Sequence, residues 1–251
     1  SLEYLNSGSV DFASTAGLAA VLSRANGSPV KSIYIQSQPE WTALLVAKDS
    51  KIKNLKDLKG KKIAATKGTD PFLFTLQALE TVGLNKRDVQ LVHLQHPDGK
   101  TALERKQVDA WAGLDPLMAS AQVQSGAKLL YRNVSFNSYS VLNVKEQFIK
   151  DSPEAIEAVI KAYEQARKWA KANPDKVAAL LAKEAKLPLQ VAKLQLSRTN
   201  FEQNIPNSKH IAALQKSGSI LLDEDLVRKG TNVNQVVSQL FDARFAQKVV
   251  K

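Results

Sequence analysis

The stretch KKIAATKGTDPFLFTLQALETVG, Lys61–Gly83, decides the fold class of this chain. Its apolar run at residues 63–66 predicts a short strand, and the following Lys67-Gly68 predicts a tight turn. Apolar residues recur at helical spacing from Phe72 onward, and Thr69 is the expected N-cap of that helix. The stretch therefore predicts strand, turn and helix, which is the repeating unit of an α/β fold.

The turn of this unit is a candidate site for an anion. A strand that enters a helix through a glycine turn leaves backbone N–H groups and the positive end of the helix dipole at the carboxyl edge of the sheet. Gly68 also allows a ligand to approach the backbone closely. The candidate contacts are Lys67, Gly68, Thr69 and Asp70. Taken alone, this stretch fits an ordinary βα turn better, because every α/β protein has several such turns and most bind nothing, so other parts of the chain must decide.

A second strand, turn and helix precedes the first. Residues 10–13 predict a short strand, a polar turn follows, and residues 18–25 predict a helix. Ser14, Thr15 and Gly17 occupy the turn. Their hydroxyl and N–H groups either contact a ligand or simply cap the helix, and both interpretations stay open.

The remaining pattern places the strands in the first half of the chain. Further strands are expected at residues 30–36, 41–47, 89–94, 108–113 and 127–131. Three successive βα units predict a parallel sheet with helices on both faces. From Ser152 onward the pattern is helical without strands, with helices expected near residues 208–217, 223–229 and 233–245.

The concentration of strands in the first part of the chain, with only helices after residue 152, predicts a molecule of two lobes. Residues 1–46 and 141–251 form one lobe, which includes the C-terminal helices, and residues 47–140 form the other. The extended segments at residues 41–48 and 139–145 would be paired crossover strands that act as a hinge. Because neither a Met nor a signal segment precedes Ser1, we expect that an upstream piece with the first strand and helix of a lobe is missing.

Composition narrows the class of protein. The 251 residues include 35 Lys and Arg against 24 Asp and Glu, a net charge of +11 that fits an anionic ligand. The basic residues are dispersed and no nucleic-acid motif accompanies them, which favours a solvated basic surface over nucleic-acid binding. No apolar run is long enough to span a membrane. The absence of Cys excludes disulfides, thiol catalysis and Cys-based metal sites.

No catalytic or metal site is predicted. The three His are His93, His96 and His210, and no carboxylate cluster lies beside them in sequence, so a zinc site is not favoured. His96, at the carboxyl edge of its strand, is a candidate ligand contact. Asp109 and Asp115 flank a strand, but a turn residue and an N-cap explain them better than an acid–base pair. The sequence gives no reason to expect an enzyme or a cofactor.

Several motifs resemble a known family. The chain is similar to the aliphatic-sulfonate-binding proteins of the nitrate, sulfonate and taurine group of ABC-transporter substrate-binding proteins. The resemblance covers about residues 1–145, whereas the tail matches only in its helical character. It rests on LNSGSVDF at residues 5–12, LKDLKGKKIA at residues 55–64, TKGT at residues 66–69, and VDAW at residues 108–111 followed by Asp115-Pro116.

The resemblance implies a periplasmic type II binding-protein fold, with two α/β lobes that close on a ligand and deliver it to a membrane permease. It implies a monomer that is peripheral to the membrane, and it adds no catalytic residue. The implied contacts are Ser14, Thr15 and Gly17 in one lobe, and residues 67–70 with Asp115 in the other. Residues 69–72 depart from the family pattern, in which a small polar residue and then a His or an aromatic residue commonly follow the Gly, and Leu114 stands where many relatives have Trp. An acidic Asp70 beside a sulfonate is unfavourable unless its side chain points away.

The predicted function is therefore capture of a small organic anion, most specifically an aliphatic sulfonate, in a cleft between the lobes. Nitrate, an aromatic acid or a thiamine precursor remain alternative solutes within the same family. An enzyme similar to the thiamine-pyrimidine synthases is disfavoured, since those rely on a Cys-rich motif and this chain has no Cys. A ligand-sensing regulator would need a DNA-binding segment upstream of Ser1.

Overall fold

The computed structural model describes residues 1–250 and contains two compact units. Unit 1 comprises residues 1–39 and 138–173 together with the chain from Asn200 onward. Unit 2 comprises residues 40–137 and 174–199. The chain therefore passes from one unit to the other four times.

Unit 2 contains a five-stranded sheet in the order β5-β4-β6-β3-β7. Strand β4 is parallel to β5 and β6, as predicted, whereas β3 is antiparallel to both of its neighbours, β6 and β7. The parallel arrangement expected of the βα units is therefore confirmed, and β3 stands outside it because it follows β2 without a crossover helix. The strands are β3 Thr42–Val46, β4 Lys62–Ala65, β5 Gln90–His93, β6 Ala110–Leu114 and β7 Lys128–Tyr131.

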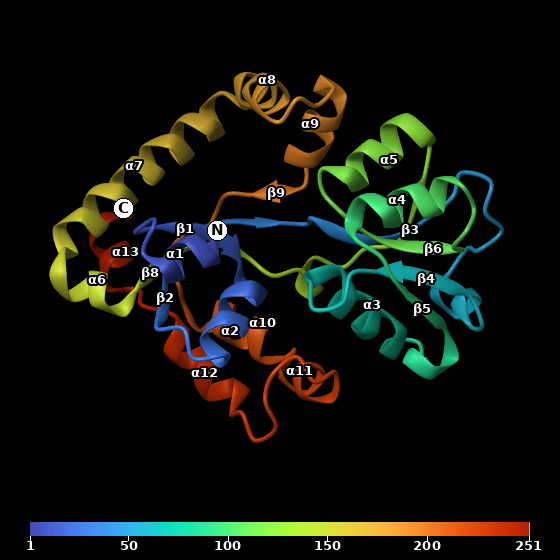
Figure 1. Ribbon diagram of the computed structural model, residues 1–251. Helices are drawn as coiled ribbons and strands as arrows, with labels where there is room; N and C mark the ends of the chain where they lie inside the picture. The colour runs from blue at the N-terminus through green and yellow to red at the C-terminus, as the bar shows by residue number, and fades with distance from the viewer. Residues whose placement is uncertain (251) are drawn as a thin grey trace. The chain divides into compact units, whose positions relative to one another are not determined.

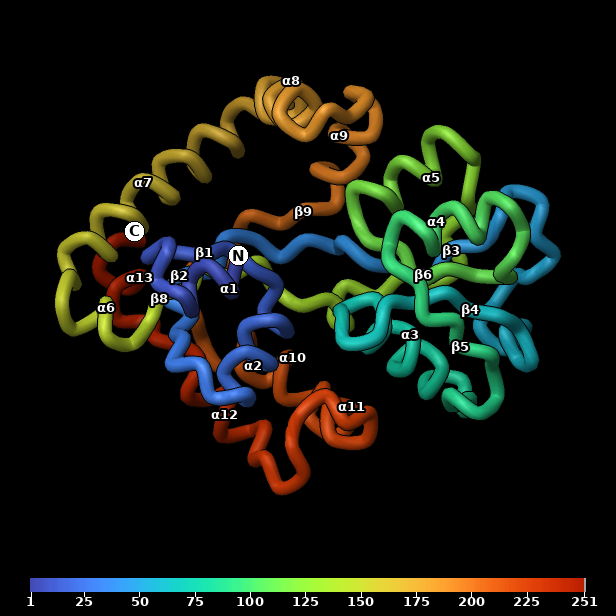
Figure 2. The backbone as a smooth tube through the Cα atoms, viewed as in Figure 1, coloured from blue at the N-terminus to red at the C-terminus, as the bar shows by residue number. Residues whose placement is uncertain are grey.

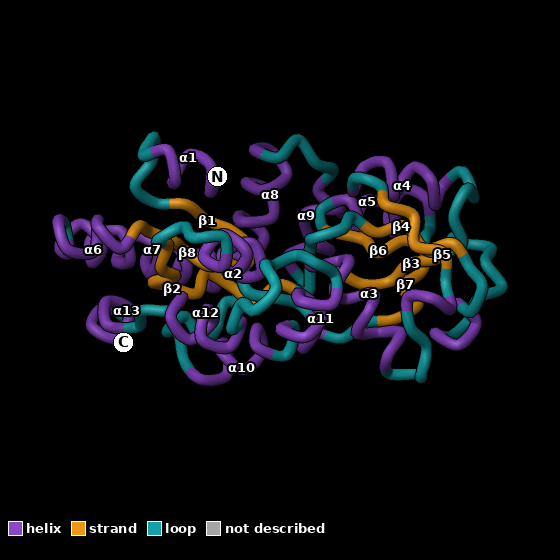
Figure 3. Tube along the Cα trace, turned by 60° about the horizontal axis from the view of Figure 1, so that its bottom comes forward, coloured by secondary structure: helices purple, strands orange, loops and turns teal. Residues whose placement is uncertain are grey.

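Helices cover both faces of this sheet (Figure 3). Helix α3 lies on one face, and α4 and α5 lie on the other, around a core that includes Leu45, Trp111 and Met118. Gly99 lets α4 approach closely, because a Cβ there would be 2.6 Å from Nε1 of Trp111. The helices of this unit are α3 Asp70–Glu80, α4 His96–Glu104, α5 Leu117–Ser125, α8 Pro174–Glu184 and α9 Leu189–Leu196, with short 3-10 helices at Leu55–Leu58, Lys86–Asp88 and Val134–Phe136.

Unit 1 is built on a four-stranded sheet in the order β1-β8-β2-β9. Strand β8 pairs antiparallel with β1 and β2, and the core on one face joins Tyr34, Leu142, Ile156 and Phe245 from β2, β8, α7 and α13 (Figure 1). The strands are β1 Ala13–Ala16, β2 Val30–Pro39, β8 Ser140–Lys145 and β9 Thr199–Asn200. The helices are α1 Leu2–Ser7, α2 Gly17–Ala25, α6 Glu146–Asp151, α7 Pro153–Ala172, α10 Ser208–Gln215, α11 Gly218–Asp223, α12 Val233–Leu240 and α13 Arg244–Val249.

The division of the chain differs from the predicted lobes in the C-terminal half. Residues 174–199 pack with unit 2, not with the unit that holds the rest of the tail. Their helix α9 packs against α5, as the tube in Figure 2 shows, and Arg198 forms an ion pair with Asp115. The expected crossover segments do not pair with each other either, because β3 belongs to the sheet of unit 2 and β8 to that of unit 1.

The helical tail also differs in detail from its prediction. The expected helix at residues 233–245 is two helices, interrupted where the backbone N–H of Asp242 donates to the carbonyl of Ser32 at 3.0 Å. The helix expected at residues 223–229 instead occupies Gly218–Asp223. A two-residue strand, β9, lies in a region predicted to have none. These features depend on tertiary contacts that local periodicity does not report.

His210 is a buried histidine in the core of unit 1, with an exposed fraction of 1%. Its ring packs edge to face against Tyr139, at 4.5 Å between centroids, and Nδ1 accepts the backbone N–H of Asn207 at 3.1 Å. Burial, with a smaller contribution from Lys209, lowers its pKa to about 4. The folded protein therefore holds this imidazole neutral.

We predict that His210 makes the protein less stable in mild acid. Protonation favours the unfolded chain as the pH falls from the ordinary pKa of 6.5 towards the folded value of about 4. This one group should lower the free energy of unfolding by roughly 3 kcal/mol over that range. Urea titrations at several pH values should show a shallower pH dependence in His210→Gln than in the wild type. Identical slopes would show that His210 does not titrate as described.

Candidate functional site

The carboxyl edge of the parallel strands in unit 2 gathers most of the predicted ligand residues. Residues 67–70 follow β4, His96 follows β5, and Asp115 follows β6. Because these three strands are parallel neighbours, their carboxyl ends lie at one edge of the sheet. Ligands of open α/β sheets bind at this edge, so it is the candidate site of unit 2.

The N-terminus of α3 carries unpaired backbone donors. Thr69 occupies the N-cap position but makes no capping bond, because its hydroxyl donates to the carbonyl of Thr66 at 2.6 Å. Gly68 has a φ of 78°, a conformation that favours glycine. Within residues 1–250, the backbone N–H groups of Gly68 and Thr69 have no acceptor. Together with the helix dipole, these two donors are suited to an anion.

The two charged residues of this turn have different surroundings. Lys67 is exposed and forms no ion pair in the described part of the chain. Its ammonium is therefore available to a ligand. Asp70 is buried at the first position of α3, where the helix dipole stabilises its carboxylate. The predicted contact at Asp70 stays a prediction.

His96 contributes a neutral imidazole to this edge. The hydroxyl of Thr66 donates its single hydrogen to the carbonyl of Leu94 at 2.7 Å and lies 3.2 Å from Nδ1 of His96. The imidazole must therefore donate from Nδ1, which leaves Nε2 as an acceptor. Burial lowers the pKa of His96 below its ordinary value. His96 therefore adds no positive charge for an anion at neutral pH.

The carboxylate of Asp115 is fully engaged within unit 2. Arg198 donates to both of its oxygens, at 2.7 and 2.9 Å, and the backbone N–H of Ala119 in α5 donates to it at 2.9 Å. The third guanidinium nitrogen, Nη1, donates a hydrogen bond to Oε1 of Gln122 at 2.8 Å. Burial outweighs Arg198 and raises the pKa of Asp115. These bonds support a structural role for Asp115, and we leave it out of the binding set proposed below.

Arg198 is a residue that sequence reasoning missed. Its side chain is 6% exposed and that of Asp115 is 2% exposed, so the pair is buried. The two residues lie 83 positions apart in sequence. No local signal marks Arg198, because it simply ends a helical segment. Only the packing of α9 onto α5 brings it to the end of β6.

The predicted residues of unit 1 are arranged differently from the expected turn. Ser14 and Thr15 lie within β1, so their side chains point to opposite faces of the sheet. Ser14 is exposed and accepts from Gln36 at 2.8 Å, whereas Thr15 accepts from the buried Asn143 at 2.8 Å. These bonds favour Ser14 over Thr15 as a ligand contact.

The N-terminus of α2 begins at Gly17, whose N–H donates to the carbonyl of Tyr139 at 2.7 Å. That amide is therefore unavailable to a ligand. The first turn of an α-helix leaves its leading amides without intrahelical acceptors, so the start of α2 resembles that of α3 in this respect. The predicted contact at Gly17 stays a prediction.

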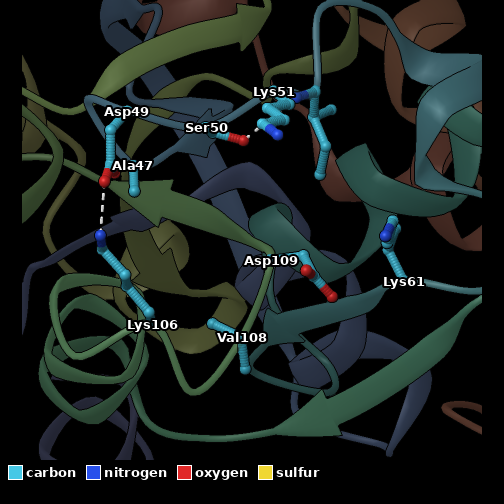
Figure 4. A pocket seen from close by; sticks show the side chains of 9 residues that line it. Ala47, Asp49, Ser50, Lys51, Lys61, Lys106, Val108 and Asp109 are labelled. Atoms are coloured by element: carbon cyan, nitrogen blue, oxygen red, sulfur yellow. Dashed lines mark hydrogen bonds and ion pairs between the residues drawn. The ribbon is translucent and has the colours of Figure 1, made fainter.

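A separate pocket of about 280 Å³ lies at the opposite, amino edge of the sheet of unit 2 (Figure 4). Its two carboxylates are engaged, Asp49 by Lys106 and Asp109 by the backbone N–H of Lys62 at 2.8 Å. None of the predicted ligand residues lines it, so it is distinct from the candidate site. The lining residues are Ala47, Asp49, Ser50, Lys51, Ile52, Lys61, Lys106, Val108 and Asp109.

Other kinds of site are not found in residues 1–250. No three His, Asp or Glu side chains there come together in a way that could hold a metal ion. Across the same residues, every helix is too short or too polar to cross a lipid bilayer.

Comparison with known proteins places the chain in a family. Residues 1–177 match the family model described as NMT1/THI5 like. The chain belongs to the NMT1/THI5-like family. A protein of Escherichia coli (strain K12) named for binding aliphatic sulfonates is 30% identical over 241 residues, which cover 95% of this chain and 76% of the relative. A protein of Bacillus subtilis (strain 168) with the same name is 29% identical over 242 residues, 95% of this chain and 73% of the relative.

The fold agrees with this relationship. The crystal structure of the periplasmic aliphatic sulphonate binding protein SsuA from Escherichia coli matches with a TM-score of 0.85 at 29% identity, covering 93% of this chain and 77% of that one. The predicted family and the periplasmic binding-protein fold are therefore confirmed. The relatives named here are binding proteins.

We predict that Arg198→Ala strongly destabilises this NMT1/THI5-like protein. The change leaves the buried carboxylate of Asp115 without its partner, which should cost about 3–5 kcal/mol of unfolding free energy. The matched control is Arg132→Ala, which removes a guanidinium that is 52% exposed and paired with Glu40. That change should cost less than about 1 kcal/mol. Equal losses for the two variants in urea denaturation would contradict a structural role for the buried pair.

Proposed function

We propose that the protein is the substrate-binding component of an ABC transporter and that it captures an aliphatic sulfonate. The observation that carries the proposal is the pair of unpaired amides at Gly68 and Thr69 beside the free ammonium of Lys67. The relatives named for sulfonate binding support the same class of ligand.

The chemistry of the site suits a sulfonate. The head group keeps its negative charge throughout the physiological pH range and offers three oxygens as acceptors. Two amide donors and one ammonium can satisfy these oxygens, and the dipole of α3 stabilises the charge. The neutral His96 adds an acceptor that suits a donor elsewhere on the ligand, such as a hydroxyl group.

The wider setting follows from the same proposal. Such a protein would work outside the cytoplasmic membrane and deliver its ligand to a permease, without chemical change to the ligand. The monomeric state and the position of the ligand between the lobes stay predictions. Nitrate, aromatic acids and thiamine precursors are the competing solutes of the family, and binding measurements separate them.

Isothermal titration calorimetry tests this function directly. Ethanesulfonate and taurine should bind with roughly micromolar affinity, about −8 kcal/mol. Nitrate and sulfate should bind more weakly. Failure of both sulfonates to bind a protein shown to be folded by circular dichroism would overturn the sulfonate assignment.

Replacing Lys67 tests the turn itself. We predict that Lys67→Ala weakens ethanesulfonate binding about fivefold to tenfold at low salt, because one charge near the anion is lost. Added salt should reduce the difference between variant and wild type. The control is Lys61→Ala, which removes an exposed lysine at the other edge of the same sheet. Equal effects of the two changes would mean that only the overall charge matters.

A further inference from the structure

The indole of Trp41 holds a buried donor that nothing in the described chain accepts. Its Nε1 is shielded from solvent and has no hydrogen-bond partner within residues 1–250. An indole nitrogen can only donate, so this assignment does not depend on how an amide or imidazole is oriented. Buried polar atoms of folded proteins nearly always have a partner, and each exception calls for an explanation.

Trp41 lies at the edge where the candidate site is built. It directly precedes β3, and β3 pairs antiparallel with β6 so that Thr42 faces Leu114. The backbone N–H of Asp115 donates to the carbonyl of Trp41 at 2.8 Å. The start of β3 therefore coincides with the carboxyl ends of β6 and β4. Strand β6 lies between β3 and β4, so two strand spacings, about 10 Å, separate the start of β3 from the end of β4.

The side chain of Trp41 also belongs to the face that carries His96. Side chains alternate along a strand, so Trp41 follows Ala43 and Leu45, which pack in the core beneath α4 and α5. His96 is the first residue of α4. The indole of Trp41 and the imidazole of His96 thus lie on the same side of the sheet, at the same edge.

Two further buried side-chain oxygens, both from glutamines, have the opposite polarity. Gln77 and Gln195 each present a buried Oε1 without a partner in the described chain, and a carbonyl oxygen accepts hydrogen bonds. An anion requires donors. Compared with these two glutamine oxygens, the indole of Trp41 is the group whose chemistry matches a negatively charged guest.

We propose that the indole N–H of Trp41 donates a hydrogen bond to an oxygen of the bound anion. The inference rests on the proposed function and adds a specificity-determining residue to that site. The donor is held by the strand pairing of β3 with β6, so it selects for a ligand with an acceptor oxygen at that position.

Trp41→Phe tests the inference, because it removes the N–H and keeps an aromatic ring. Affinity for ethanesulfonate should fall about tenfold or more, as expected for a lost hydrogen bond to a charged acceptor. The melting temperature without ligand should fall by only a few degrees, about what the smaller ring costs in packing, since no protein acceptor loses a bond. The control Trp169→Phe alters a residue that is 45% exposed and should change neither quantity.

A second measurement uses the wild-type protein, so its result does not depend on packing lost in the variant. The wild type contains three Trp, and ¹⁵N correlation spectra show one indole N–H signal for each. The Trp41 signal should move downfield as ethanesulfonate saturates the protein, while that of Trp169 stays in place. An unchanged affinity in Trp41→Phe, or a stationary Trp41 signal at saturation, would overturn the inference alone. Absence of any sulfonate binding by the wild type would overturn the proposed function and this inference with it.

Discussion

The first turn of a helix leaves backbone N–H groups that must find acceptors, and the site of unit 2 depends on how two helices meet this requirement. At α5 the carboxylate of Asp115 accepts an amide and is itself neutralised by Arg198. At α3 the hydroxyl of Thr69 turns back to the preceding carbonyl, and the amides of Gly68 and Thr69 keep no partner in the described chain. One helix end is therefore closed by the protein, and the other is open to a ligand at the same edge of the sheet.

The buried pair of Arg198 and Asp115 also explains how the chain is divided. Residues 174–199 come from the helical tail, yet they pack with unit 2 and end at this ion pair. The backbone N–H of Glu40 donates to the carbonyl of Arg198 at 2.8 Å, next to the point where the chain first enters unit 2. A buried ion pair contributes little net stability, but its loss is costly, so it fixes one arrangement of these segments.

The features that depend on short stretches of sequence were predictable. The pattern of Lys61–Gly83 predicted β4, the glycine turn and α3, and with them the edge position of residues 67–70. The edge position of His96 followed from the strand expected at residues 89–94. Features that depend on distant partners were not. Arg198 lies 83 residues from Asp115, and the opposite orientations of Ser14 and Thr15 follow from their place in β1. Trp41 appears in sequence as an ordinary strand residue, because an unsatisfied donor is a property of three-dimensional packing.

The most direct test of this account is a crystal structure of the protein with ethanesulfonate bound. We expect sulfonate oxygens at hydrogen-bonding distance, roughly 2.7–3.2 Å, from the backbone nitrogens of Gly68 and Thr69. The carboxylate of Asp115 should keep both of its bonds to Arg198. A sulfonate seated elsewhere, with the amides of Gly68 and Thr69 bonded to protein or solvent, would contradict the claim that the open end of α3 is the anion site.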